Sequence, residues 1–130
     1  MTKYVADTHG IVWFLEKSPK LGKNAREVFL DEKITLIIPT IVLAEIKFLY
    51  NKQRFRTSLE NVLKVIKNDP RCIVYPMTMD VVEILPISLN IHDAIIVGTA
   101  LIFRNIYHEE IKVITKDKEI KSSGLIGTVW

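Results

Sequence analysis

The sequence contains five short runs of mainly apolar and β-branched residues that lack regular polar alternation. They cover residues 4–6, 33–38, 72–75, 112–115 and 126–130. A strand with one face in water alternates apolar and polar side chains, whereas a strand covered on both faces does not. These runs therefore indicate a sheet with helices on both faces, and such sheets are built mainly from parallel strands.

Segments with helical spacing of apolar residues separate these runs. We expect helices over residues 10–16, 23–30, 41–51, 56–67 and 91–104, and a short helix that starts at Thr78 and stops before Pro86. Thr78 and Asn90 are suitable N-caps, and Pro39 or Thr40 suits the entrance to helix 41–51. A turn at residues 122–124 precedes the last strand.

This alternation predicts a three-layer α/β/α sandwich with a central, mainly parallel five-stranded sheet. The chain has 130 residues and no repeat or linker, so residues 1–130 are expected to form a single domain. The apolar stretches 34–46 and 94–103 are too short to cross a bilayer, and the first residues do not resemble a signal peptide. We therefore expect a cytoplasmic protein without a membrane partner.

Cysteine usage and charge restrict the function further. Cys72 is the only cysteine, which excludes an intramolecular disulfide and a multi-cysteine zinc site. The net charge of +3 is compatible with a polyanionic partner but does not require one. A function must therefore be sought in particular polar residues.

Two acids follow predicted strands directly or nearly so. Asp7 comes immediately after the run 4–6, and Asp117 follows the run 112–115 after one intervening residue. In parallel α/β sheets, functional sites form beyond the carboxyl ends of the strands. An Asp between a strand and a helix is also a common N-cap, so capping is an equally good explanation of either residue taken alone.

Glu45 interrupts the apolar stripe of its predicted helix, because Ile41, Val42 and Leu49 are its neighbours on the helical wheel. A buried carboxylate needs an ion-pair partner, hydrogen bonds or a cation. The structural alternatives are a salt bridge within the core and a position at the stripe's edge, where Glu45 reaches water.

Asp93 comes three residues after Asn90, which resembles a capping box with Asp in place of Glu or Gln. It also shares a helical face with Ile96 and Val97, so its side chain is expected to point toward the interior. Both a capping role and a place in a pocket remain open for Asp93.

If Asp7, Glu45, Asp93 and Asp117 meet, their mutual repulsion raises some of their pKa values unless a cation lies between them. Oxygen ligands with room for water suit Mg²⁺ or Mn²⁺ and argue against zinc. Such a site polarises a phosphodiester and activates a bound water. The four acids therefore predict a metal-dependent phosphodiesterase.

Each acid also lies in a longer motif: residues 4–13 (YVADTHGIVW), 39–46 (PTIVLAEI), 92–100 (HDAIIVGTA) and 114–117 (ITKD), followed by the closing TVW of residues 128–130. In their order and spacing these motifs resemble those of the PIN-domain ribonucleases, and particularly the VapC-like toxins of toxin–antitoxin pairs. The resemblance extends over the whole chain. One departure is Ala94, where many relatives carry a basic or small polar residue.

The resemblance implies a PIN fold and RNA cleavage that depends on Mg²⁺ or Mn²⁺. It also implies a homodimer and inhibition by an antitoxin protein. By analogy Asp7, Glu45, Asp93 and Asp117 hold the metal, directly or through water, and Thr115 and Thr8 orient a carboxylate or a water.

Basic residues and histidines near the motifs allow two readings. Lys47, Lys52, Arg54, Arg56, Lys116 and Lys118 are candidates for guiding RNA phosphates, although surface charges usually serve solubility. His9 and His92 flank two of the acids, and a hydrogen-bonded structural role is the favoured explanation of both.

Three rival functions differ in class. A phospho-acceptor signalling domain also has acids at strand ends, but it requires adjacent acids after the first strand, where Asp7 stands alone. A PIN module that binds RNA or protein without cleaving it is disfavoured by the intact set of four acids. An RNA-processing nuclease without a toxin role remains open.

Overall fold

The structure, a computed structural model, describes residues 2–130 and contains one sheet of five parallel strands. The strands are β1 (Lys3–Ala6), β2 (Thr35–Pro39), β3 (Cys72–Tyr75), β4 (Ile111–Ile114) and β5 (Gly127–Val129). Their order across the sheet is β3-β2-β1-β4-β5, and every neighbouring pair is parallel. The expected five-stranded sheet is thus confirmed, with β1 at its centre.

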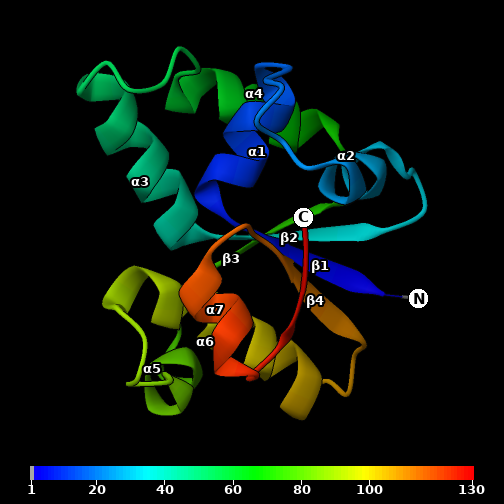
Figure 1. The fold of residues 1–130 in the computed structure, drawn as a ribbon, viewed down its shortest axis with the longest axis vertical. Coiled ribbons are helices and arrows are strands. Elements are labelled where there is room, and N and C mark those ends of the chain that lie inside the picture. Colours follow the sequence, from blue (N-terminus) through cyan, green and yellow to red (C-terminus); the bar gives the residue numbers. More distant parts are fainter. Residues whose placement is uncertain (1) are drawn as a thin grey trace.

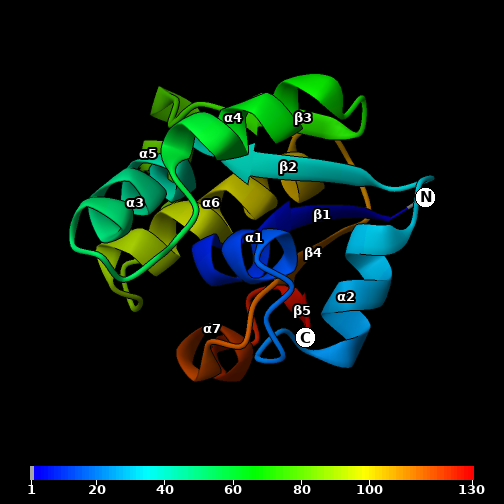
Figure 2. The same ribbon diagram turned by 90° about the horizontal axis from the view of Figure 1, so that it is seen from above.

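Helices cover both faces of this sheet, as the solid apolar runs predict. The helices are α1 (Thr8–Leu15), α2 (Lys23–Leu30), α3 (Thr40–Asn51), α4 (Leu59–Asn68), α5 (Met79–Ile84), α6 (Ile91–Asn105) and α7 (Lys118–Ser123). Figure 1 shows α1 to α4 above the sheet and α5 to α7 below it, and Figure 2 shows the same layers from above. The three-layer α/β/α sandwich is therefore confirmed.

Helix α6 forms the centre of the lower layer. All ten residues from 94 to 103 are buried, which explains why this part of the sequence is a solid apolar run although it is helical. Gly98 allows α5 to approach closely, because a Cβ there would lie 3.3 Å from Leu85 Cδ2 and 3.5 Å from Val81 Cγ1.

No helix within residues 2–130 is both long and apolar enough to cross a membrane.

Most element boundaries agree with the prediction to within two residues, and two differences are larger. Helix α4 starts at Leu59 with Ser58 as its N-cap, not at residue 56, because Glu16 accepts hydrogen bonds from the backbone of Arg56 and Thr57. This contact withdraws residues 56 and 57 from the helix.

Helix α7 is the other difference, since the sequence predicted only a turn at residues 122–124. Asp117 caps α7, and Gly124 ends it with a left-handed φ of 67°. Its six residues are too few for the apolar periodicity that identifies longer helices.

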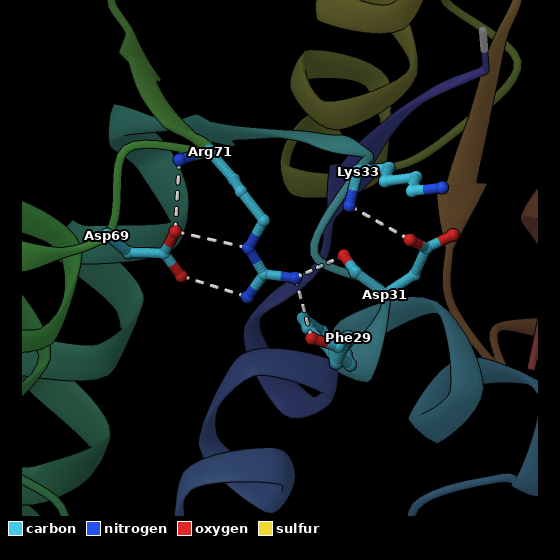
Figure 3. A network of polar contacts seen from close by, with 5 residues as sticks. All are labelled: Phe29, Asp31, Lys33, Asp69 and Arg71. Atoms are coloured by element: carbon cyan, nitrogen blue, oxygen red, sulfur yellow. Dashed lines mark hydrogen bonds and ion pairs between the residues drawn. The ribbon is translucent and has the colours of Figure 1, made fainter.

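Arg71 ties the end of α2 to the segment before β3 (Figure 3). Its guanidinium forms a two-pronged contact with the Asp69 carboxylate, with Nη2 2.9 Å from Oδ2 and Nε 3.1 Å from Oδ1. Nη1 donates to the carbonyl oxygens of Phe29 and Asp31 at 2.8 and 2.6 Å. Hydrogen bonding from Arg71 also holds the pKa of Asp69 below its usual range. The segment that contains Asp69 and Arg71 is therefore an anchor for α2.

Candidate active site

The register of the central strands brings the first and fourth motifs together. Ala6 at the end of β1 pairs with Ile114 at the end of β4, and the Asp7 amide donates to the Ile114 carbonyl at 3.2 Å. The residues after both strands, Asp7 and Asp117, therefore emerge at the same edge of the sheet. This edge is the one at which parallel α/β folds form their sites.

Asp7 is buried, with 9% of its surface exposed, between β1 and α1. Its Oδ1 accepts a hydrogen bond from the Gly10 amide at 2.8 Å and so caps α1. The pKa of Asp7 is raised to about 6, mainly by burial and to a smaller extent by the nearby charges of Glu45 and Asp117, while hydrogen bonds from Thr115 and Gly10 oppose the shift. The carboxylate is thus held rigidly in a place that disfavours its charge.

Asp117 is held in a similar way at the start of α7. Its Oδ1 accepts from the amides of Glu119 and Ile120, both at 2.9 Å, and its own amide donates to Thr115 Oγ1 at 3.1 Å. Capping is therefore correct for both Asp7 and Asp117. It uses Oδ1 of each side chain, so each carboxylate has a second oxygen with which to face a cavity.

Asn90 is the N-cap of α6, as expected, but its partner contact with Asp93 runs between the two side chains and does not involve the Asn90 backbone amide as in a capping box. The Asp93 amide donates to Asn90 Oδ1 at 3.0 Å, and Asn90 Nδ2 donates to Asp93 Oδ2 at 2.8 Å. Partial burial raises the pKa of Asp93, and so do Asp117, Glu119 and Glu45, against the hydrogen bond from Asn90. Asp93 therefore contacts the N-cap residue of α6 through one carboxylate oxygen and also lies among the other acids.

Glu45 projects from α3 toward α6. Its side chain is 27% exposed, and Oε2 lies 3.2 Å from His92 Nδ1. Glu45 therefore lies at the edge of the apolar stripe of its helix, where it reaches water, and does not form a salt bridge within the core. The contact also gives His92 the hydrogen-bonded role that the sequence favoured.

All four acids line one cavity of about 560 Å³. Its walls also include Thr8, His9, Asn90, His92, Ile96, Lys116 and Lys118. Within residues 2–130, however, no three Asp, Glu, His or Cys side chains are close enough to form a ready-made metal site. The four acids thus share a cavity without converging on one point.

The lining of this cavity fits a hydrated divalent cation. The donors are carboxylate oxygens, which suit Mg²⁺ or Mn²⁺, and their mutual repulsion is the electrostatic condition that a cation relieves. Thr8 Oγ1 is buried at the same wall and has no hydrogen-bond partner among the described residues. A buried hydroxyl of this kind is satisfied by a further polar ligand or a water.

The six candidate RNA-binding residues divide into two groups. Lys116 and Lys118 line the cavity. Lys47, Lys52, Arg54 and Arg56 are exposed but are not among the residues that line it. Only the first two are thus positioned to contact a phosphate that lies at the acids.

Two sets of contacts made by α1 and its C-cap residue were not predictable from the sequence. Glu16, which resembles an ordinary solvated helix residue in the sequence, accepts three hydrogen bonds through Oε2 from Arg56 and Thr57. His9 contacts Trp13 and Phe55 through its ring, with centroids 5.1 and 5.5 Å apart. The sequence showed that His9 lies close to Asp7 along the chain. It did not show the aromatic contacts of His9, because Phe55 lies in a loop that is distant in sequence.

The raised pKa of Asp7 predicts a pH-dependent stability of the metal-free protein. Because the folded pKa of about 6 exceeds the unfolded value of 3.8, the folded state binds more protons between these values, and stability falls as the pH rises through 6. Asp7→Asn keeps a capping oxygen and removes the charge. We expect it to stabilise the protein by about 2–3 kcal/mol at pH 7.5 and to have little effect near pH 4.

Urea unfolding in EDTA at the two pH values measures this difference. Asp80→Asn, an exposed substitution on α5, is the matched control. A variant at position 7 that is less stable than wild type at pH 7.5 contradicts the electrostatic explanation.

Comparison with known proteins agrees with the motifs. The PIN domain family model matches residues 4–124. No curated protein matches the sequence. Among solved structures, VapBC2 from Rickettsia felis bound to a DNA fragment from their promoter resembles this chain, with a TM-score of 0.65 and 18% identity over 98% of each chain. At this identity the likeness concerns the fold, whereas the family match covers nearly the whole sequence: the chain belongs to the PIN domain family.

Proposed function

We propose that this protein is a divalent-metal-dependent ribonuclease that cleaves RNA phosphodiesters. The observation that carries the proposal is the meeting of Asp7, Glu45, Asp93 and Asp117 in one cavity at the carboxyl ends of β1 and β4. Membership of the PIN domain family supports the same chemistry.

Asp7, Glu45, Asp93 and Asp117 are the residues that would hold Mg²⁺ or Mn²⁺, directly or through water. A bound cation would supply Lewis-acid activation of a water and stabilisation of the leaving oxygen. The choice of these ions over zinc follows from the oxygen donors.

The chain's own residues have distinct parts in this proposal. Thr115 donates a hydrogen bond to Asp7 and accepts one from the Asp117 amide, so it links the Asp7 carboxylate to the backbone at Asp117. The unpartnered hydroxyl of Thr8 orients a water or a carboxylate at the same wall. Lys116 and Lys118 attract the RNA phosphates into a cavity that otherwise repels them.

The first test is cleavage of single-stranded RNA by purified protein. We expect activity with added Mg²⁺ or Mn²⁺, its loss in EDTA, and a fall of at least about 100-fold in kcat/KM for Asp7→Asn and Asp93→Asn, because each removes a negative ligand. Asp80→Asn, which changes an exposed acid outside the cavity, keeps wild-type activity. Thermal unfolding shows whether each variant is folded.

Activity that survives EDTA, or that persists in both variants, contradicts the mechanism. A folded wild-type protein that binds RNA and never cleaves it with either metal favours the non-catalytic PIN module.

We further propose that this nuclease acts as a toxin in the cytoplasm. The fold is shared with VapBC2 from Rickettsia felis, which was solved bound to a promoter DNA fragment. Because VapC-like toxins belong to toxin–antitoxin pairs, we propose that the protein partner of this chain is a cognate antitoxin. Expression of this chain alone is expected to arrest growth, and Asp93→Asn is expected to relieve the arrest. Colony counts after induction measure both effects. Normal growth with active soluble enzyme supports a processing nuclease instead.

We also propose that the protein is a homodimer. Apolar side chains on α5, on the segment that follows it and at the start of α6 are highly exposed: Met79 by 71%, Ile87 by 96% and Ile91 by 68%. Neighbouring exposed apolar side chains of this kind are typical of protein interfaces. Multi-angle light scattering is expected to give twice the chain mass of 15.0 kDa for wild type and one chain mass for Ile87→Asp combined with Met79→Asp.

Leu30→Asp is the control for this pair, because Leu30 is 62% exposed on α2, on the opposite layer. A wild-type protein that is monomeric at micromolar concentration contradicts the proposed dimer.

A further inference from the structure

Beside the acidic cavity lies a group of four aromatic rings, His9, Trp13, Phe55 and Trp130, which we name the aromatic cluster. The ring centroids of His9 lie 5.1 Å from Trp13 and 5.5 Å from Phe55, and Trp13 lies 5.9 Å from Trp130. All three contacts are edge-to-face, the geometry that aromatic rings prefer. The cluster is therefore a packed unit.

His9 is the member of the aromatic cluster that lines the cavity. Its ring is half-buried and packs edge-to-face against Phe55, which is 8% exposed. Within residues 2–130 the His9 ring nitrogens make no hydrogen bond to the acids, unlike His92, which contacts Glu45. His9 thus places an aromatic ring at the cavity wall without being tied to a carboxylate.

Two distant parts of the chain hold the aromatic cluster in place. Glu16 fixes the loop after Phe55 through three hydrogen bonds to Arg56 and Thr57. Trp130 packs on Gly22 so closely that a Cβ on Gly22 would lie 2.3 Å from the Trp130 carbonyl carbon. A ring whose orientation is fixed in advance loses little entropy when a ligand stacks on it.

The ammonium group of a lysine, Lys116, lies next to the aromatic cluster. Lys116 Nζ lies 4.6 Å from the centre of the Trp13 ring, and Lys116 itself lines the cavity. The pairing of an aromatic surface with a held ammonium group is the chemistry that single-stranded nucleic acid sites use, one for a base and one for a phosphate.

We infer that His9 stacks on an unpaired base of the RNA substrate, next to the phosphate that enters the acidic cavity, while Lys116 contacts a phosphate beside that base. His9 is in this role a specificity-determining residue, and the enzyme selects single-stranded RNA because a base within a duplex is unavailable for stacking. The inference rests on the proposed function for its substrate but concerns binding, so it is testable without cleavage.

Fluorescence anisotropy with a short labelled single-stranded RNA, in EDTA and at low salt, measures binding alone. We expect His9→Ala to weaken the Kd by about tenfold, the effect of losing one stacked base. His9→Phe keeps the aromatic surface and is expected to bind within about twofold of wild type. His108→Ala, which removes an exposed histidine outside the cavity, is the matched control and leaves the Kd unchanged.

An RNA series in which one nucleotide at a time is abasic tests the same contact without changing the protein. At one position the missing base is expected to weaken wild-type binding by the same factor, and His9→Ala is expected to have no additional effect on that RNA. Additive losses at every position overturn the inference. So does an equal loss in His9→Phe and His9→Ala, which indicates that the imidazole nitrogens act instead.

Failure of the inference and failure of the proposed function are distinguishable. If wild type cleaves RNA in a metal-dependent reaction while His9→Ala binds and cleaves normally, the ribonuclease function is supported and the stacking role of His9 is contradicted. If RNA binding depends on His9 but no metal supports cleavage, the stacking role of His9 is supported and the proposed catalytic function is contradicted.

Discussion

Asp7 is buried at the end of the central strand, and much of the site depends on how the fold tolerates its charge. The carboxylate lies where desolvation raises its pKa to about 6, beside the like charges of Glu45 and Asp117. Two hydrogen bonds, from Gly10 and Thr115, compensate for part of this cost. Gly10 is needed for the arrangement, because a Cβ there would lie 3.0 Å from Asp7 Oδ1. The backbone around Asp7 is thus adapted to a charge that the local environment disfavours, which is typical of functional carboxylates.

The same backbone groups that stabilise the acids also define their directions. Asp7 and Asp117 each use Oδ1 to cap a helix, and Asp93 uses Oδ2 to accept a hydrogen bond from Asn90, the N-cap of α6. Capping and participation in the cavity are therefore complementary, because a carboxylate has two oxygens and a cap occupies one of them. Helix N-termini also favour nearby negative charge, so three of the four acids gain support from the helices that they begin.

The sequence allowed prediction of those features that depend on neighbours along the chain. The solid runs identified all five strands, and the placement of Asp7 and Asp117 after two of them predicted the edge at which they meet. Contacts between residues distant in sequence were not predictable. Glu16 contacts Arg56 and Thr57 across about 40 residues, and this contact also delays the start of α4. The pairing of Glu45 with His92 depends on how α3 packs against α6, which no local pattern encodes.

The site also has two parts that differ in rigidity. Asp7 and Asp117 follow adjacent paired strands, so their backbone positions are fixed by the sheet. Glu45 and Asp93 belong to helices α3 and α6, and Glu45 carries its carboxylate on a longer side chain that is 27% exposed and contacts His92. The four acids consequently share a cavity without a ready-made three-ligand site among the described residues. A change of the Glu45 rotamer, with loss of its His92 contact, alters the separation of the acids without a change in the sheet. The spacing of the acids is therefore set by the sheet on one side and by the packing of α3 against α6, with the Glu45–His92 contact, on the other.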